Sequence, residues 1–92
     1  MVRYRVKPER VLEHEALIHA VFAALNSSAP DGLRYGAFKQ PDGVSFVHIA
    51  FVAAGNPLQA LPAFNAFTER LKERCDEMPV TVELTSVGLF GL

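Results

Sequence analysis

The sequence predicts an α+β domain in which a four-stranded antiparallel sheet carries two helices on one face. The main observation is the order of the periodic segments, because strand-like and helical runs follow one another as β-α-β-β-α-β. A second observation is the tight-turn signature Pro41-Asp42-Gly43 between two β-rich runs, which predicts a hairpin. The third is the length of 92 residues, which suits a single domain spanning residues 1–92.

The first two elements are a strand over residues 2–7 and a helix over residues 9–27. Side chains of the strand alternate between the two faces, with Val2, Tyr4 and Val6 on one and Arg3, Arg5 and Lys7 on the other. Pro8 ends the strand because proline offers no backbone donor to a ladder. The helix is predicted by apolar residues at helical spacing, namely Val11, Ile18, Val21, Phe22 and Leu25. Turn-forming residues at 26–28 and 30–32 end it.

The central hairpin consists of strands predicted over residues 33–40 and 44–53. Gly36 weakens the first of them, since a glycine in a strand has no side chain to pack. Gly55-Asn56-Pro57 closes the second strand. Asn56 is a good helix cap, and Pro57 suits a first helical position.

The last two elements are a helix over residues 58–77 and a strand over residues 80–90. Pro62 would break a helix interior, so the regular helix is expected to begin at about Leu61. Its buried stripe is expected to hold Leu61, Phe64, Phe67, Leu71 and Cys75. Pro79 is expected to end the helical region. The final strand then places Val80, Val82 and Leu84 on one face and Thr81, Glu83 and Thr85 on the other.

Right-handed crossovers and the hairpin leave one common arrangement for this order, the ferredoxin-like split βαβ fold with strand order 4-1-3-2. We assign the apolar side of residues 2–7 to the helix-covered face, together with Val47, Ile49 and Phe51. The second face then carries the basic residues of the first strand, together with Phe46, His48, Glu83 and Thr85. Arg3 or Arg5 is expected to lie beside His48 on one side and Glu83 on the other.

Residues 44–52, Val-Ser-Phe-Val-His-Ile-Ala-Phe-Val, are apolar on both sides of the predicted strand. A strand with helices on one side and water on the other would alternate between apolar and polar residues. A domain of this size buries only about 60–65% of its unfolded surface, too little to cover both faces with its own residues. We therefore expect a homodimer in which a second copy covers the open sheet face.

Composition argues against several classes of protein. A net charge of −1 gives no global field for nucleic acid or for an anionic membrane surface. No run reaches the roughly 18 apolar residues of a membrane span, and the N-terminus lacks the apolar core of a signal peptide. The single cysteine, Cys75, excludes an intrachain disulfide and favours a reducing cytoplasm. We expect a cytoplasmic protein without a nucleic-acid or membrane partner.

The stretch Ser45-Phe46-Val47-His48-Ile49-Ala50-Phe51, followed by Pro62-Ala63-Phe64-Asn65-Ala66-Phe67, resembles the dimeric α/β-barrel superfamily in its antibiotic-biosynthesis-monooxygenase-like branch. The resemblance covers nearly the whole chain as a pattern of length and element order. It implies a homodimer whose sheets pack face to face, with small cavities between sheet and helices. Members include cofactor-independent monooxygenases of aromatic polyketides, haem-degrading enzymes, isomerases and proteins of no known activity.

Haem-degrading members carry a histidine on the second helix and a tryptophan, and this chain has neither. The resemblance therefore implies chemistry without a cofactor, on a small apolar or aromatic molecule. Such chemistry needs a few polar side chains to polarise the substrate, and the candidates for this catalytic role are Tyr4, Tyr35, His48 and Asn65. The candidates for ligand contact are Arg5, Phe46, Phe64 and Phe67.

Each candidate also has a structural interpretation. His48 is either a general base or hydrogen-bond donor at a cavity wall, or an interior histidine bonded to Glu83 or to the partner chain. Arg3 and Arg5 either clamp an anionic ligand or lie at an interface matched to Glu83 or to the other subunit. Phe64 and Phe67 are core residues before they are part of a cofactor site.

Metal and nucleotide sites have no support in the sequence. His14 and His19 are five residues apart and face different sides of the predicted helix, so both are expected on the surface. Cys75 is expected to be a small core residue rather than a nucleophile. Gly32, Gly36 and Gly43 form no phosphate-binding loop that leads into a helix.

Two functions remain open. One is a small homodimeric enzyme of the monooxygenase-like group that oxidises or binds a small apolar or aromatic molecule. The alternative is a non-catalytic dimerisation or ligand-sensing module of unassigned activity. The first rests mainly on likeness of fold, which by itself does not determine a function.

Overall fold

The structure is a computed structural model that describes residues 1–52 and 57–90. The predicted turn at Gly55-Asn56 lies outside the described residues. In chain order the elements are β1 (Val2–Val6), the 3₁₀ helix η1 (Pro8–Arg10), α1 (Val11–Ser28), β2 (Leu33–Lys39), β3 (Ser45–Val52), the 3₁₀ helix η2 (Pro57–Ala60), α2 (Pro62–Glu69), α3 (Leu71–Arg74) and β4 (Cys75–Thr81).

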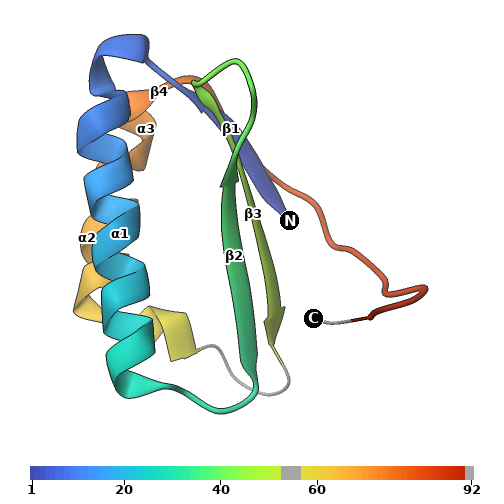
Figure 1. The fold of residues 1–92 in the computed structure, drawn as a ribbon. Coiled ribbons are helices and arrows are strands. Elements are labelled where there is room, and N and C mark those ends of the chain that lie inside the picture. Colours follow the sequence, from blue (N-terminus) through green and yellow to red (C-terminus); the bar gives the residue numbers. More distant parts are fainter. Residues whose placement is uncertain (53–56, 91–92) are drawn as a thin grey trace.

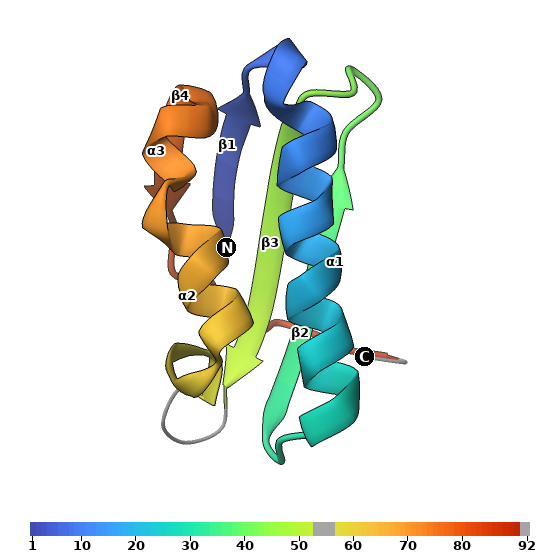
Figure 2. The same cartoon turned by 90° about the vertical axis from the view of Figure 1, so that its left-hand side faces the viewer.

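The four strands form one open antiparallel sheet, and the helices lie on one side of it (Figure 1). Seen from the helical side, α1 lies in front of β2 and β3, whereas α2 and α3 lie toward β1 and β4 (Figure 2). No helix of the described chain covers the other side of the sheet, which we call the open face. The predicted α+β class with a four-stranded antiparallel sheet is confirmed.

The strand order is β2-β3-β1-β4, which read from the other edge is 4-1-3-2. The central strand β1 pairs with β3, with Tyr4 opposite Phe46, and with β4, with Val6 opposite Cys75. The strands β2 and β4 are the edges of the sheet. This order places the two most buried strands, β1 and β3, under the junction between the two helical segments (Figure 2).

The hairpin predicted from Pro41-Asp42-Gly43 is confirmed, because β2 and β3 pair along their whole length. The carboxylate of Asp42 accepts hydrogen bonds from the backbone N–H groups of Val44 and Ser45, at 3.0 and 2.8 Å. Gly43 has a φ of 79°, a conformation that glycine adopts without steric cost. The turn chemistry therefore fixes the register of β3, and with it the position of His48.

The predicted face of β3 is wrong. Tyr4 lies opposite Phe46, and residues paired across two strands share a face of the sheet. Since Tyr4 faces the helices, Phe46 and His48 face them too, and both are buried. Val47, Ile49 and Phe51 therefore lie on the open face. A strand that is apolar on both sides has no alternation by which its buried side could be chosen.

The predicted boundary between the last helix and the last strand is also wrong. The helical region ends at Arg74, and β4 begins at Cys75. Pro79 lies inside β4 instead of before it. This is tolerated because β4 is an edge strand, where the missing donor of a proline costs no ladder bond. Beyond β4 only Val82 still pairs, with Met1, and residues 83–90 form no strand.

The first helix agrees with its predicted range of 9–27, since η1 and α1 together span Pro8 to Ser28. The second helical region is less regular than the predicted helix over 58–77. It is divided into η2, α2 and α3, with an interruption at Arg70. Leu61 caps α2, and Pro62 occupies its first position, as expected for a helix that starts at about Leu61.

The core lies between the sheet and the helices. Its fully buried apolar members come from strands and helices on both sides of the layer, and they are Tyr4, Val6, Val21, Phe46, Phe67 and Cys75. Three polar or charged residues are buried with them, namely His14, His48 and Arg74. Within the described residues, no helix has the length and apolar character that crossing a membrane requires.

Candidate functional site

Five polar side chains from five different elements are joined by hydrogen bonds in the core. We call them the buried network: Arg74 of α3, His14 of α1, Tyr4 of β1, His48 of β3 and Tyr35 of β2. Arg74 Nε donates to His14 Nδ1 at 3.1 Å, and His14 Nε2 lies 2.6 Å from the Tyr4 hydroxyl. That hydroxyl lies 2.7 Å from His48 Nε2, and His48 Nδ1 lies 2.6 Å from the Tyr35 hydroxyl. The bonds run without interruption from Arg74 to Tyr35.

Helix periodicity places His14 in this network. Val11, His14, Ile18, Val21 and Leu25 follow one another at spacings of three and four, so they share one face of α1. The apolar members of this stripe belong to the core or pack against it, and His14 itself has an exposed fraction of 0%. A histidine on such a stripe must find its hydrogen-bond partners inside the protein.

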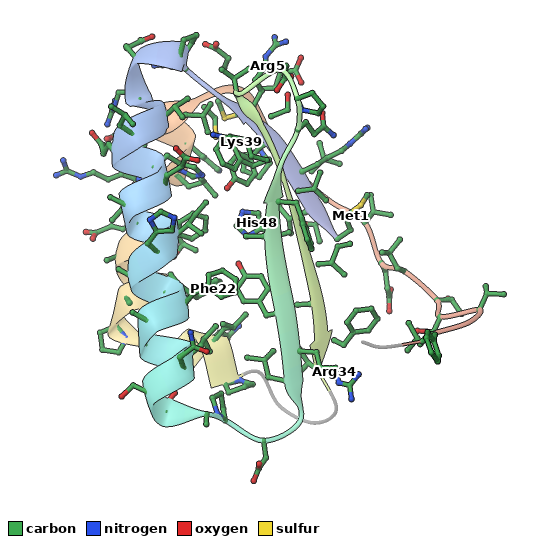
Figure 3. The ribbon with its side chains drawn as sticks, in the orientation of Figure 1. Met1, Arg5, Phe22, Arg34, Lys39 and His48 are labelled. Atoms are coloured by element: carbon green, nitrogen blue, oxygen red, sulfur yellow. The ribbon has the colours of Figure 1, made fainter. Side chains whose placement is uncertain are left out.

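The sheet register brings the other rings to the same place. His48 lies opposite Val2 on β1 and opposite Ala37 on β2. Tyr4 and Tyr35 each stand two residues from those partners, so both side chains point to the same face of the sheet as His48. Figure 3 shows His48 and Phe22 in the layer between α1 and the sheet.

Aromatic side chains enclose the network. The ring of Phe46 is stacked on Tyr4 at a centroid distance of 5.8 Å and meets the ring of His14 edge-on at 4.8 Å. The ring of Phe67 lies 5.3 Å from His14 and 5.5 Å from His48. This wall keeps water away from the two imidazoles and strengthens the hydrogen bonds between them.

Burial shifts the pKa values of the network toward the neutral forms. It lowers the pKa of His48 to about 4 and, together with the charge of Arg74, that of His14 to about 4. It raises the pKa of Tyr35 to about 12, and burial raises the pKa of Tyr4 as well. At neutral pH both histidines are uncharged and both tyrosines keep their protons. The site is therefore a set of neutral hydrogen-bonding groups beside one cation.

That cation is Arg74, whose side chain is 1% exposed. Its guanidinium donates to His14 and to the backbone carbonyl of Phe67, and it lies over the Phe67 ring at 5.7 Å. No carboxylate among the described residues is within ion-pair distance of it. Burial lowers the pKa of Arg74, and the charge of Glu13, whose carboxylate is bound to Arg10 at 2.8 Å, acts in the opposite direction.

Two empty spaces adjoin the Tyr35 end of the network. One is a narrow void with no room for a water molecule, and it is lined by Ile18, Val21, Phe22, Tyr35, His48 and Phe67. An open pocket of about 310 Å³ lies between α1 and β2, and it shares Ile18 and Phe22 with the void. Phe22 is stacked on Tyr35 at 5.1 Å. Phe22 therefore separates the open pocket from the hydroxyl of Tyr35.

The structure brings together some of the candidates from the sequence and separates others. Tyr4, Tyr35 and His48 are bonded to one another, and Phe46 and Phe67 line them. Phe64 is one ring further out, at 6.1 Å from Phe67. His48 is bonded to the two tyrosines and not to Glu83, which is exposed after the end of β4.

Asn65 and Arg5 are not part of this site. The amide of Asn65 is exposed and donates to the carbonyl of Gln59 at 3.3 Å. Arg5 points to the open face, where it forms an ion pair with Glu77 at 3.1 Å instead of the expected one with Glu83. Asn65 lies on the outer side of α2, and the alternation of β1 turns Arg5 away from Tyr4.

Two members of the buried network, His14 and Arg74, were not among the candidates from the sequence. His14 was expected on the surface but is buried, whereas His19 is exposed as expected. The signal was present in the spacing of the two apolar stripes. His14 continues the stripe of α1, and Arg74 continues the series Phe64, Phe67 and Leu71 at spacings of three and four. When the apolar stripes of two helical segments each contain one polar residue, those two residues are expected to contact each other.

The arrangement can orient a ligand through hydrogen bonds, but it offers no metal site. No group of three or more histidine, cysteine, aspartate or glutamate side chains in residues 1–52 and 57–90 could hold a metal ion. Cys75 is buried, and burial raises the pKa of its thiol, which disfavours the nucleophilic thiolate. Comparison of the chain with protein-family models, with curated proteins and with solved structures finds no significant match.

Proposed function

We propose that this chain is one subunit of a homodimeric, ferredoxin-like α/β barrel of the monooxygenase-like group. It takes a small apolar or aromatic molecule between its sheet and helices and oxidises it without a cofactor. The observation that carries the proposal is the position of the Tyr35 hydroxyl, where the buried network reaches an apolar void next to an open pocket. Ligand sites typically combine apolar walls with a few convergent polar groups.

The route to the site runs past Phe22. The pocket between α1 and β2 is already open, and rotation of the Phe22 ring would join it to the void at Tyr35. An aromatic ligand could then replace Phe22 as the ring stacked on Tyr35, so that little aromatic contact is lost. The oxygen of a phenolic ligand would lie within reach of the Tyr35 hydroxyl, in a space that excludes water.

The proposed dimer is supported by the open face. Val47, Ile49 and Phe51 lie there without any helix of the described chain over them. Further exposed apolar side chains lie on β2, on β4 and after β4, namely Phe38, Val80, Val82, Leu84, Val87, Leu89 and Phe90. Val87 and Phe90 are fully exposed. A second copy packed on this face would bury these side chains, and full burial of each large apolar side chain is favourable by about 1.5–3 kcal/mol relative to its exposure to water.

The second candidate, a non-catalytic dimerisation or ligand-sensing module, is favoured by one observation. The void at Tyr35 and His48, lined also by Ile18, Val21, Phe22 and Phe67, has no room even for a water molecule. A network whose members are bonded to one another inside the core can serve to fix the packing without taking a ligand. The two candidates differ in whether Phe22 opens and whether oxygen is consumed.

Oxygen uptake with a panel of phenols and naphthols tests the proposal. We expect the wild-type protein to consume oxygen with at least one member of the panel, and His48→Ala to lose the activity. Asn65→Ala is the control, because Asn65 is exposed on α2 and lies outside both the buried network and the pocket. Binding without oxygen uptake would favour the sensing module. If no member of the panel binds and none causes oxygen uptake, a ligand site here is ruled out.

A further inference from the structure

We propose that Arg74 fixes the direction of every hydrogen bond in the buried network, so that the proton of the Tyr35 hydroxyl is the one left for a ligand. The site then selects small apolar molecules that carry a hydrogen-bond acceptor over molecules that carry only a donor. This selection rests on the proposed ligand site, whereas the direction of the network does not.

The first bond has only one possible direction. The guanidinium of Arg74 has donors and no acceptor, so its Nε–H donates to His14 Nδ1 over 3.1 Å. The Nδ1 atom of His14 therefore carries no proton. Because a neutral imidazole keeps one N–H, the proton of His14 is on Nε2, and it is donated to the Tyr4 oxygen over 2.6 Å.

The next two bonds follow from the first. The Tyr4 oxygen accepts from His14, and its own proton has one remaining partner, His48 Nε2 at 2.7 Å. His48 then accepts at Nε2, so its proton is on Nδ1 and is donated to the Tyr35 oxygen at 2.6 Å. His14 and His48 thus hold opposite tautomers.

The reverse direction at His48 leaves a buried proton without an acceptor. If His48 donated from Nε2, the Tyr4 oxygen would accept from both histidines and its hydroxyl proton would have no partner. Tyr4 is 4% exposed, and it makes no other hydrogen bond in the described structure. In the proposed direction the hydroxyl proton without an acceptor is that of Tyr35, which is only partly buried and borders the void. This is the end of the network at which a new partner can arrive.

The free hydroxyl proton of Tyr35 determines which polar group a ligand needs. A carbonyl oxygen or the oxygen of a deprotonated phenol can accept it, whereas a group with only an N–H cannot. The buried cation at the far end of the line, without a carboxylate in contact among the described residues, orients all the dipoles toward an acceptor. The lowered pKa values of the two imidazoles, about 4 each, keep them in the neutral forms that the line requires.

The direction is tested without any ligand or variant. Long-range ¹H–¹⁵N correlation spectra of the uniformly labelled protein at pH 7 distinguish a protonated from an unprotonated ring nitrogen. We expect His14 to be protonated at Nε2 and His48 at Nδ1. If both histidines share one tautomer, or if His48 carries its proton at Nε2, the proposal is overturned.

The role of Arg74 is tested by Arg74→Met, which keeps most of the side-chain volume and removes the donor. We expect the His48 signals to move away from the single Nδ1-protonated pattern, with the fold retained by circular dichroism. A variant that folds and keeps both wild-type tautomers would show that Arg74 does not set the direction. If the variant does not fold, the spectra of the wild-type protein still decide the direction.

The selection is tested with two probes of similar size, acetophenone, which only accepts, and indole, which only donates. We expect acetophenone to bind wild-type protein at least tenfold more tightly than indole, and Tyr35→Phe to remove that preference. Equal binding by the wild-type protein, or tighter binding of indole, overturns the selection. If neither probe binds, the proposed ligand site and the selection fail together, and the tautomer result is unaffected.

Discussion

The Nε atom of Arg74 donates to Nδ1 of His14 over 3.1 Å, and both side chains are almost completely buried. This bond joins the end of the second helical segment to α1 at the centre of the layer. Removing one partner of such a bond leaves a buried polar group unsatisfied, which typically costs more than the bond itself contributes. The stability of the fold and the protonation of its core are therefore coupled, and this coupling can be measured.

The first prediction concerns pH. The pKa values of His14 and His48 are lowered by burial to about 4 in the folded protein, from an ordinary value of 6.5. Between these values the unfolded chain binds more protons, so the free energy of unfolding falls as pH falls below 6.5. We expect a loss of roughly 2 kcal/mol per histidine between pH 7 and pH 5. Urea denaturation at the two pH values measures it. His48→Gln should show about half the pH dependence of the wild-type protein.

The second prediction compares the two tyrosines. Tyr4→Phe removes the hydroxyl that serves both histidines, so two buried ring nitrogens lose a partner. We expect a loss of about 2–4 kcal/mol in the free energy of unfolding. Tyr35→Phe removes the hydrogen-bond partner of only one ring nitrogen, at a partly buried position. It should lower the free energy of unfolding by about 1 kcal/mol. Equal effects in urea titrations would contradict the central position of Tyr4.

The third prediction concerns the end of α1. Ala29 follows the helix with a φ of 43°, and its backbone N–H donates to the carbonyl of Leu25 at 2.7 Å. A residue with a Cβ is strained in this left-handed conformation, and glycine is not. We expect Ala29→Gly to raise the free energy of unfolding by about 1 kcal/mol. Ala23→Gly, at an exposed position inside the same helix, should lower it by about 0.5–1 kcal/mol, and thermal melts should show shifts of opposite sign.

The sequence predicted most of the fold because its local signals agree with one another. The hairpin turn, the alternation of β1 and the periodicity of α1 all hold in the structure. The face of β3 could not be predicted, since Phe46 and Val47 are equally apolar and only the pairing with Tyr4 distinguishes them. The start of β4 was misplaced because Cys75 continues the helical spacing of Leu71.

The candidate site was predicted in part. Tyr4, Tyr35 and His48 were selected as polar side chains that could polarise a substrate, and they do meet. The partner of each polar residue depends on which elements pack together, and this depends on contacts across the fold rather than on local pattern. His14 was misplaced for this reason, because it was compared with His19, five residues away, while its own position continued the apolar stripe.

The fourth prediction concerns the open face. Ile49 lies opposite Gly36 on that face, near the centre of the sheet, where the proposed second copy would cover it. An arginine there would be buried without a partner in the dimer, so we expect Ile49→Arg to weaken self-association roughly 100-fold or more. Sedimentation equilibrium over a range of protein concentrations measures this. Leu12→Arg is the matched control, because Leu12 is 84% exposed on α1 and lies outside the proposed interface. A wild-type protein that stays monomeric and stable at micromolar concentration would rule out the dimer and the barrel it forms.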